Sequence, residues 1–306
     1  MEKLFRHTRS GSYKTRARYK SSCKLFLKFV HEKFRLKNLR NLQDKHVVAY
    51  IQNRHAEGIA PKTLKNDLGA IRYLHDMIPN PKYRLSDNEK LKNLYDVVLE
   101  KTPAVKGDRG WTDEEYQRFY EFADERASEN QTAADTRDII VLCRTMGLRI
   151  VEAVAMHRSQ AEKALRTGIY QVRNEAKNGK WRQVPLSVEV REMLTDRLKK
   201  IERGQKVFVQ PDEKTHHAIN RLEKFLETHR NKFTTTEGEQ KRLYEGQASP
   251  LTFHGLRYNY VQERVKQEMK KGYMYEQAAL IVTKEVGHER TDVIKVYLGG
   301  KSRATD

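Results

Sequence analysis

The sequence has little cysteine and no long apolar run. Cys23 and Cys143 are the only cysteines among 306 residues, and neither lies at a CxxC or Cys/His spacing. The sequence therefore supports neither a disulfide framework nor a structural zinc site, and a reducing compartment fits best. No window approaches 18 consecutive apolar residues, and the N-terminal segment MEKLFRHTRSGSYK lacks the apolar core of a signal peptide. We expect a cytoplasmic protein with no membrane contact.

Motifs for nucleotides and metals are missing as well. The chain contains no GxxxxGK[ST] phosphate-binding loop and no cluster of acidic residues with two-metal spacing. We therefore expect no cofactor, neither ATP nor a metal ion. The sequence also has no internal repeat and no low-complexity tract, and this argues against a solenoid architecture.

Positive charge, by contrast, is abundant. The chain has 60 Lys and Arg against 41 Asp and Glu, a formal net charge of +19. Residues 1–50 alone hold 14 basic and three acidic residues. Such a field attracts a polyanion, so double-stranded DNA is the expected partner, although charge alone leaves open a generally basic, solvated surface. The candidate DNA contacts in this part of the chain are Lys14, Arg16, Arg18, Lys20, Lys24, Lys62 and Lys65.

Helical periodicity organises the first hundred residues. Apolar side chains recur at helical spacing from Ser12 to Phe34, and again from Leu64 to Ile78 after Pro61. These runs predict a small basic helical domain over residues 1–100, with the apolar stripes as its core. The segment KTPAVKGDRG, residues 101–110, combines proline, glycine and charge without periodicity and is typical of a linker.

A second domain, residues 111–306, alternates helical and strand-like segments. The pattern predicts a helix ending at Gly147, a β-hairpin from residues 168–173 and 181–186 with lysines at its tip, and a helix capped by Ser187. Further helices are expected from His254 and near Tyr275. The polar, aperiodic residues 234–250 are interpreted as a surface loop.

Four separated segments of this domain carry chemically suggestive residues. In order they are GLRIVEAV (147–154), EAKNGKWRQVPL (175–186), LTFHGLRYNY (251–260) and EVGHERTDVIKVYL (285–298). A His-x-x-Arg alone is expected about once by chance in a chain with 11 His and 29 Arg, so the order of the four motifs carries the signal. This ordered set resembles the tyrosine recombinase (phage integrase) family from about Trp111 to Leu298. The N-terminal domain resembles that family's core-binding domain more loosely.

The resemblance assigns roles to individual residues. It implies that Tyr297 is the nucleophile and that Glu152 is a supporting acid next to the first catalytic arginine. The proton donor of the hairpin is Lys177, with Lys180 as the alternative. One departure is Tyr258, where many members have histidine. The implied catalytic set is Arg149, Lys177, His254, Arg257, His288 and Tyr297, with Glu152 and Lys180 in support.

Phosphodiester chemistry explains these residue types. Guanidinium groups stay charged and can make paired hydrogen bonds to phosphate, which suits Arg149 and Arg257 to a transition state with extra negative charge, and His288 adds a third donor. A phenol has a pKa near 10, so its ionisation at neutral pH costs roughly 4 kcal/mol. His254 is the expected base for that proton, and a lysine protonates the departing 5′ oxygen. The covalent 3′-phosphotyrosine conserves the bond energy without ATP.

The resemblance implies a mainly α protein with a small β-hairpin, forming a two-domain clamp around DNA. The implied activity is site-specific recombination of a mobile element in a bacterial cytoplasm, by a homotetramer that is monomeric or weakly oligomeric when free, and an accessory DNA-bending protein is compatible with it. Two alternatives stay open. A type IB topoisomerase-like enzyme would relax DNA that lacks a cognate site, and a non-catalytic DNA-binding regulator would bind DNA without forming a covalent adduct.

Overall fold

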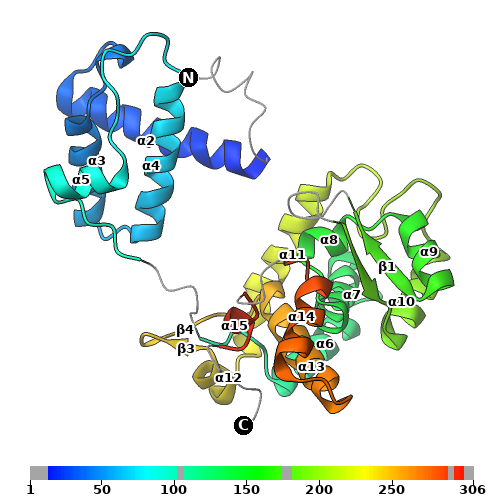
Figure 1. Ribbon diagram of the computed structural model, residues 1–306. Coiled ribbons are helices and arrows are strands. Elements are labelled where there is room, and N and C mark those ends of the chain that lie inside the picture. The colour runs from blue at the N-terminus through cyan, green and yellow to red at the C-terminus, as the bar shows by residue number, and fades with distance from the viewer. Residues whose placement is uncertain (1–12, 102–106, 174–180, 289–292, 300–306) are drawn as a thin grey trace. The chain divides into compact units, whose positions relative to one another are not determined.

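The structure is a computed structural model that describes residues 13–101, 107–173, 181–288 and 293–299, with side chains from Thr15 onward. The chain divides into two compact units, Met1–Pro103 and Ala104–Asp306, and both consist mostly of helices (Figure 1). No helix in the described ranges is long and apolar enough to span a membrane.

The N-terminal unit is built on the two helices that the sequence predicts. Cys23, Phe26 and Val30 of the first helix are buried, and this helix packs against the second. The buried carboxylate of Asp67, on the second of these helices, accepts hydrogen bonds from Ser22 Oγ (2.6 Å) on the first helix and from Tyr50 Oη (3.2 Å). The helices are α2 (Tyr13–Phe34), the short 3₁₀ turn η1 (Leu39–Asn41), α3 (Asp44–Ala56), α4 (Pro61–Asp76) and α5 (Asn88–Tyr95).

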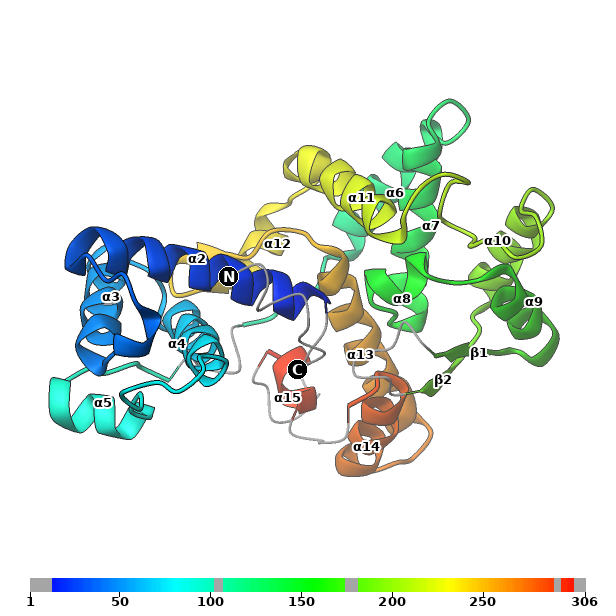
Figure 2. The ribbon, with the colours of Figure 1, turned by 90° about the horizontal axis from the view of Figure 1, so that it is seen from above.

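In the C-terminal unit, a central helix, α7 (Gln131–Met146), contacts several others around one apolar core that includes Trp111, Phe119 and Leu142 (Figure 2). The remaining helices are α6 (Asp113–Glu125), α8 (Ile150–Val154), α9 (Arg158–Thr167), α10 (Val188–Leu198), α11 (Thr215–His229), the 3₁₀ turn η3 (Arg230–Lys232), α12 (Thr236–Lys241), α13 (Phe253–Lys270), α14 (Tyr275–Glu285) and α15 (Ile294–Tyr297). The strands are β1 (Ile169–Val172), β2 (Arg182–Pro185), β3 (Leu243–Tyr244) and β4 (Gln247–Ala248).

The predicted end of α7, the predicted cap of α10 and the predicted pairing of β1 with β2 are confirmed. Gly147 ends α7 in the left-handed conformation with φ of 59°, and a Cβ atom there would lie only 2.3 Å from Cδ1 of Tyr260, so two constraints favour glycine. Ser187 Oγ accepts a hydrogen bond from the backbone N–H of Val190 at the start of α10. Strands β1 and β2 pair antiparallel, with Tyr170 opposite Val184. The hairpin tip, with Lys177 and Lys180, lies outside the described residues.

The interpretation of residues 234–250 as a surface loop is wrong. These residues form α12 and the two-stranded β3–β4 hairpin, and between them Arg242 is fully buried. Its guanidinium donates to both oxygens of Glu115, at 2.5 and 2.7 Å, and Glu115 is fully buried too. The segment thus supplies one half of an internal ion pair, and the partner residue lies 127 residues earlier in the chain.

Gly238 allows α12 to approach this ion pair. A Cβ atom at this position would lie 1.9 Å from Oε1 of Glu115. Gly238→Ala should therefore lower the unfolding free energy by about 2–3 kcal/mol, although alanine is normally the better helix former by about 1 kcal/mol. Gly69→Ala in α4 is the matched control, because the nearest atom to its Cβ is 3.6 Å away and a small stabilisation is expected. Calorimetric unfolding measures whether the unfolding free energy falls in Gly238→Ala and rises in Gly69→Ala. Changes of the same sign in both variants would contradict the packing argument.

Candidate active site

The first part of the site lies at the start of α8. Arg149 occupies the N-cap position, two residues after the left-handed turn at Gly147. Its backbone N–H donates to Glu152 Oε2 (2.8 Å) and its Nη1 to Glu152 Oε1 (2.7 Å). The Arg149 side chain keeps 21% of its surface exposed, whereas Glu152 keeps 1%. The predicted supporting acid is thus a buried anchor that holds a partly exposed guanidinium.

Arg257 and Tyr297 form the second part. Arg257 lies in the first turns of α13, whose N-terminus is capped by Thr252, and its side chain is fully buried. Its terminal nitrogens donate to the carbonyl oxygens of Gly147 and Val286, and its Nε donates to the Tyr297 hydroxyl at 3.3 Å. Tyr297 ends α15, which packs against α13, and only 4% of it is exposed.

From the chemistry of its guanidinium group, Arg257 is expected to face a phosphate with two parallel hydrogen bonds. In this structure its terminal nitrogens are engaged by backbone carbonyls, because α13, the α7–α8 turn and the end of α14 converge on this side chain. Burial lowers the pKa of Arg257. The positive charge of Arg149 lowers this pKa further, whereas the negative charge of Glu152 raises it. The two parts of the site therefore form one electrostatic unit.

Three aromatic side chains surround Tyr297. His288 Nε2 lies 3.2 Å from the Tyr297 hydroxyl. The ring centroids of His254 and Tyr258 lie 6.0 and 4.8 Å from that of Tyr297. The residue after Arg257 is thus a second phenol, Tyr258, whose burial raises its pKa. The structure brings both predicted histidines to the same tyrosine, and His288 Nε2 lies within hydrogen-bond distance of its hydroxyl.

Sequence reasoning missed Arg182, which lies on β2 next to the hairpin tip. Its two terminal nitrogens donate to the two carboxylate oxygens of Glu152, at 2.8 and 2.5 Å. Burial alone would raise the pKa of Glu152, but the hydrogen bonds from Arg182 and the positive charges of Arg182, Arg149 and Arg257 bring it down to about 2. Arg182 stands in the quoted motif, but an arginine on a strand gives no sign in sequence of a partner 30 residues away.

The predicted DNA contacts of the N-terminal unit lie on α2 and α4. Arg18, Lys20, Lys24 and Lys62 are exposed, whereas Arg16 and Lys65 are partly buried. Lys65 donates to the backbone carbonyl of Glu100 (2.8 Å). The side chain of Lys14 lies outside the described residues.

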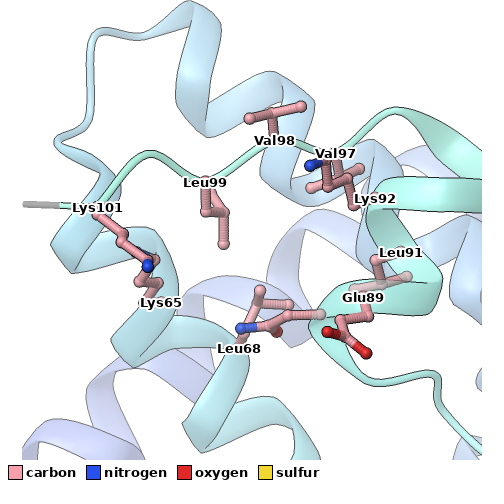
Figure 3. Close-up of a pocket in the computed structure, with 10 residues that line it drawn as sticks. Lys65, Leu68, Glu89, Leu91, Lys92, Val97, Val98, Leu99 and Lys101 are labelled. Carbon is pink, nitrogen blue, oxygen red and sulfur yellow. The ribbon is translucent and has the colours of Figure 1, made fainter.

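The N-terminal unit also contains a cavity of about 310 Å³. Its wall is made of the apolar side chains Leu68, Leu91 and Leu99, with Lys65 and Lys101 at its edge (Figure 3). None of the predicted catalytic residues lines it. Within the described ranges, no group of three or more His, Cys, Asp or Glu side chains could hold a metal ion.

Comparisons with known proteins support the fold. The solved structures that share it include three with low sequence identity to this chain. The Tn1549 transposon integrase in complex with transposon right end DNA is 14% identical, over 96% of this chain and 93% of that one, with a TM-score of 0.58. A lambda integrase dimer bound to a COC′ core site is 15% identical, over 100% and 79%, with a TM-score of 0.63. The XerH site-specific recombinase bound to a palindromic difH substrate is 18% identical, over 97% and 79%, with a TM-score of 0.57.

Family comparisons cover most of the sequence. No curated protein matches the chain. Residues 1–79 match the family described as phage integrase, N-terminal, and residues 111–271 match the phage integrase family itself. The second match spans more than half of the chain and contains the turn with Arg149, the hairpin and the His254–Arg257 pair. The chain therefore belongs to the phage integrase family of tyrosine recombinases.

Proposed function

We propose that this protein cleaves and rejoins DNA at specific sites with Tyr297 as the nucleophile. The phenol oxygen attacks the scissile phosphorus, the bond from phosphorus to the 5′ oxygen breaks, and a 3′-phosphotyrosine forms. A 5′ hydroxyl of another strand then reverses the step and releases the tyrosine. No external energy source is needed, because one phosphodiester is exchanged for another.

The contacts of the Tyr297 hydroxyl carry this proposal. The hydroxyl accepts a hydrogen bond from Arg257 Nε (3.3 Å), so its own proton points to another acceptor. His288 Nε2, at 3.2 Å, is that acceptor when the ring carries its proton on Nδ1. In this arrangement His288 takes the phenol proton, a role for which His254 is the residue expected from the sequence.

Charge supports the choice of substrate. Arg257 is a buried cation whose pKa is lowered by burial, which means that the site holds it at an electrostatic cost. An incoming phosphate would offset that cost. Arg149 is partly exposed and can reach a phosphate while Glu152 holds it. Arg149, Arg257 and one of the two histidines, His254 or His288, then share the extra negative charge of the transition state. Lys177 or Lys180 protonates the 5′ oxygen.

The proposed partner is double-stranded DNA, with the basic side chains of α2 and α4 on its backbone. The net charge of +19 and the DNA in the solved structures of the Tn1549 integrase, lambda integrase and XerH support this partner. Strand exchange between two sites requires four copies at one junction, so the proposed active form is a tetramer on DNA. An accessory DNA-bending protein is compatible with this assembly.

Mapping a covalent adduct tests the proposal. Sequencing recombination products from cells first identifies the site, and the protein is then incubated with a nicked suicide duplex that carries it. We expect an adduct in which the DNA 3′ phosphate is attached to Tyr297, found by mass spectrometry of the DNA-linked peptide. Tyr297→Phe should form none, and Tyr258→Phe should still form it. An adduct at any other residue, or relaxation of a supercoiled plasmid without the site, would overturn the proposal.

A further inference from the structure

We propose that Arg182 is a positioning residue for this reaction: it balances the charge of Glu152 and so leaves Arg149 available to the scissile phosphate. The inference rests on the proposed function, since it concerns the same phosphate. It assigns a role to a side chain that is buried behind the site and lies outside the set of residues predicted to touch DNA.

Arg182 joins three separate segments. It belongs to β2, it donates from both terminal nitrogens to Glu152 at the start of α8, and its Nε donates to the carbonyl oxygen of Glu285 (2.8 Å) at the end of α14. Its side chain is 5% exposed. The Nε and both terminal nitrogens of Arg182 thus donate to groups inside the protein. This pattern is typical of a side chain that supports its neighbours and differs from that of a side chain that binds a ligand.

The charge balance at Glu152 explains the role of Arg182. Glu152 accepts four hydrogen bonds, two from Arg182 and two from Arg149. Without Arg182, the buried carboxylate would have Arg149 as its only charged hydrogen-bond partner within the described residues. The two would form a closed pair, and Arg149 would bind phosphate only in competition with a desolvated anion. With Arg182 present, two cations share one carboxylate, and the cluster keeps a net positive charge facing the substrate.

The stem of Arg182 also touches the turn that leads to His288. Gly287 has φ of +68°, and a Cβ atom there would lie 3.0 Å from Cδ of Arg182. The arginine stem therefore packs directly on the backbone that precedes His288. One side chain thus fixes both Arg149 and the segment that carries His288 to the Tyr297 hydroxyl.

A double-mutant cycle on the full-length chain tests the inference. The rate of adduct formation on the suicide duplex is measured for Arg182→Met, Glu152→Gln and the double variant, and duplex affinity is measured by fluorescence anisotropy. We expect Arg182→Met to slow adduct formation about 10²-fold, with duplex affinity changed by less than about threefold, because the loss falls on the transition state. The double variant lacks both the buried carboxylate and the buried cation that balances it, and Arg149 keeps its positive charge. It should react about as fast as Glu152→Gln alone and faster than Arg182→Met.

Matched controls separate positioning from general damage. Arg191→Met removes an exposed arginine that donates to the carbonyl of Leu165, and it should react within about twofold of the unmodified protein. If Arg182→Met fails to fold, Glu152→Gln and the double variant still decide the matter. A further large loss on adding Arg182→Met to Glu152→Gln would overturn the charge-balance role. If the unmodified protein forms no adduct at all, the proposed function fails first, and the inference fails with it.

Discussion

Replacing Arg257 by lysine should slow covalent adduct formation by about 10³-fold and lower the unfolding free energy by about 3 kcal/mol. Adduct formation on the suicide duplex and urea unfolding measure the two effects. A conservative change of one cation for another is expected to be this damaging because of what the guanidinium contacts inside the protein.

The reason is geometric. Arg257 is fully buried and donates in three directions, to the carbonyls of Gly147 and Val286 and to the Tyr297 hydroxyl. A lysine ammonium is a compact point charge and cannot reach two carbonyls and a phenol from one fixed fork. At least one carbonyl would lose its partner in a buried environment, and the tyrosine would lose the donor that orients it.

Tyr297→Phe provides the comparison for this prediction. It removes the hydroxyl contacts with Arg257 and His288 but leaves the carbonyl contacts of Arg257, so it should cost no more than about 1 kcal/mol of stability while abolishing the adduct. A stable and active Arg257→Lys variant would show that the carbonyl contacts are dispensable, and it would contradict the geometric account of this arginine.

Arg242→Met should destabilise the C-terminal unit by about 4 kcal/mol. The change leaves Glu115 fully buried without its cation, still accepting backbone N–H groups from Thr112 and Thr235. Burial raises the pKa of Glu115, but in the intact protein the hydrogen bonds from Arg242, Thr112 and Thr235, together with the charge of Arg242, lower it overall. Thermal unfolding followed by the fluorescence of Trp111, which is buried in the same unit, measures the loss.

An exposed ion pair on α6, the helix that carries Glu115, provides the control. Arg118 and Glu114 of α6 lie 3.2 Å apart, but their side chains are 47% and 61% exposed. Arg118→Met should therefore change stability by less than about 1 kcal/mol. Similar losses in Arg118→Met and Arg242→Met would show that burial does not control the strength of these pairs, which would contradict the explanation.

Local sequence patterns located the secondary structure near the site well. The apolar spacing before Met146 and the glycine at 147 predicted the end of α7, and the Asn178-Gly179 pair between two β-prone runs predicted the β1–β2 hairpin. These signals are readable because caps, turns and helix faces depend on residues a few positions apart. Residues 234–250 were interpreted as a loop for the opposite reason: Arg242 in this polar segment pairs with a buried glutamate that is distant in the sequence, and no local pattern indicates that partner.

The sequence by itself determined which residue types are present and in what order, and this was enough to indicate phosphodiester chemistry, because the order of motifs along the chain is a one-dimensional property. Tertiary structure decided how those groups are used. It buried Arg257 among backbone carbonyls, placed His288 on the Tyr297 hydroxyl and set Arg182 behind Glu152. Such contacts join residues 9 to 110 positions apart. They follow from the packing of whole helices and strands, which no local pattern records.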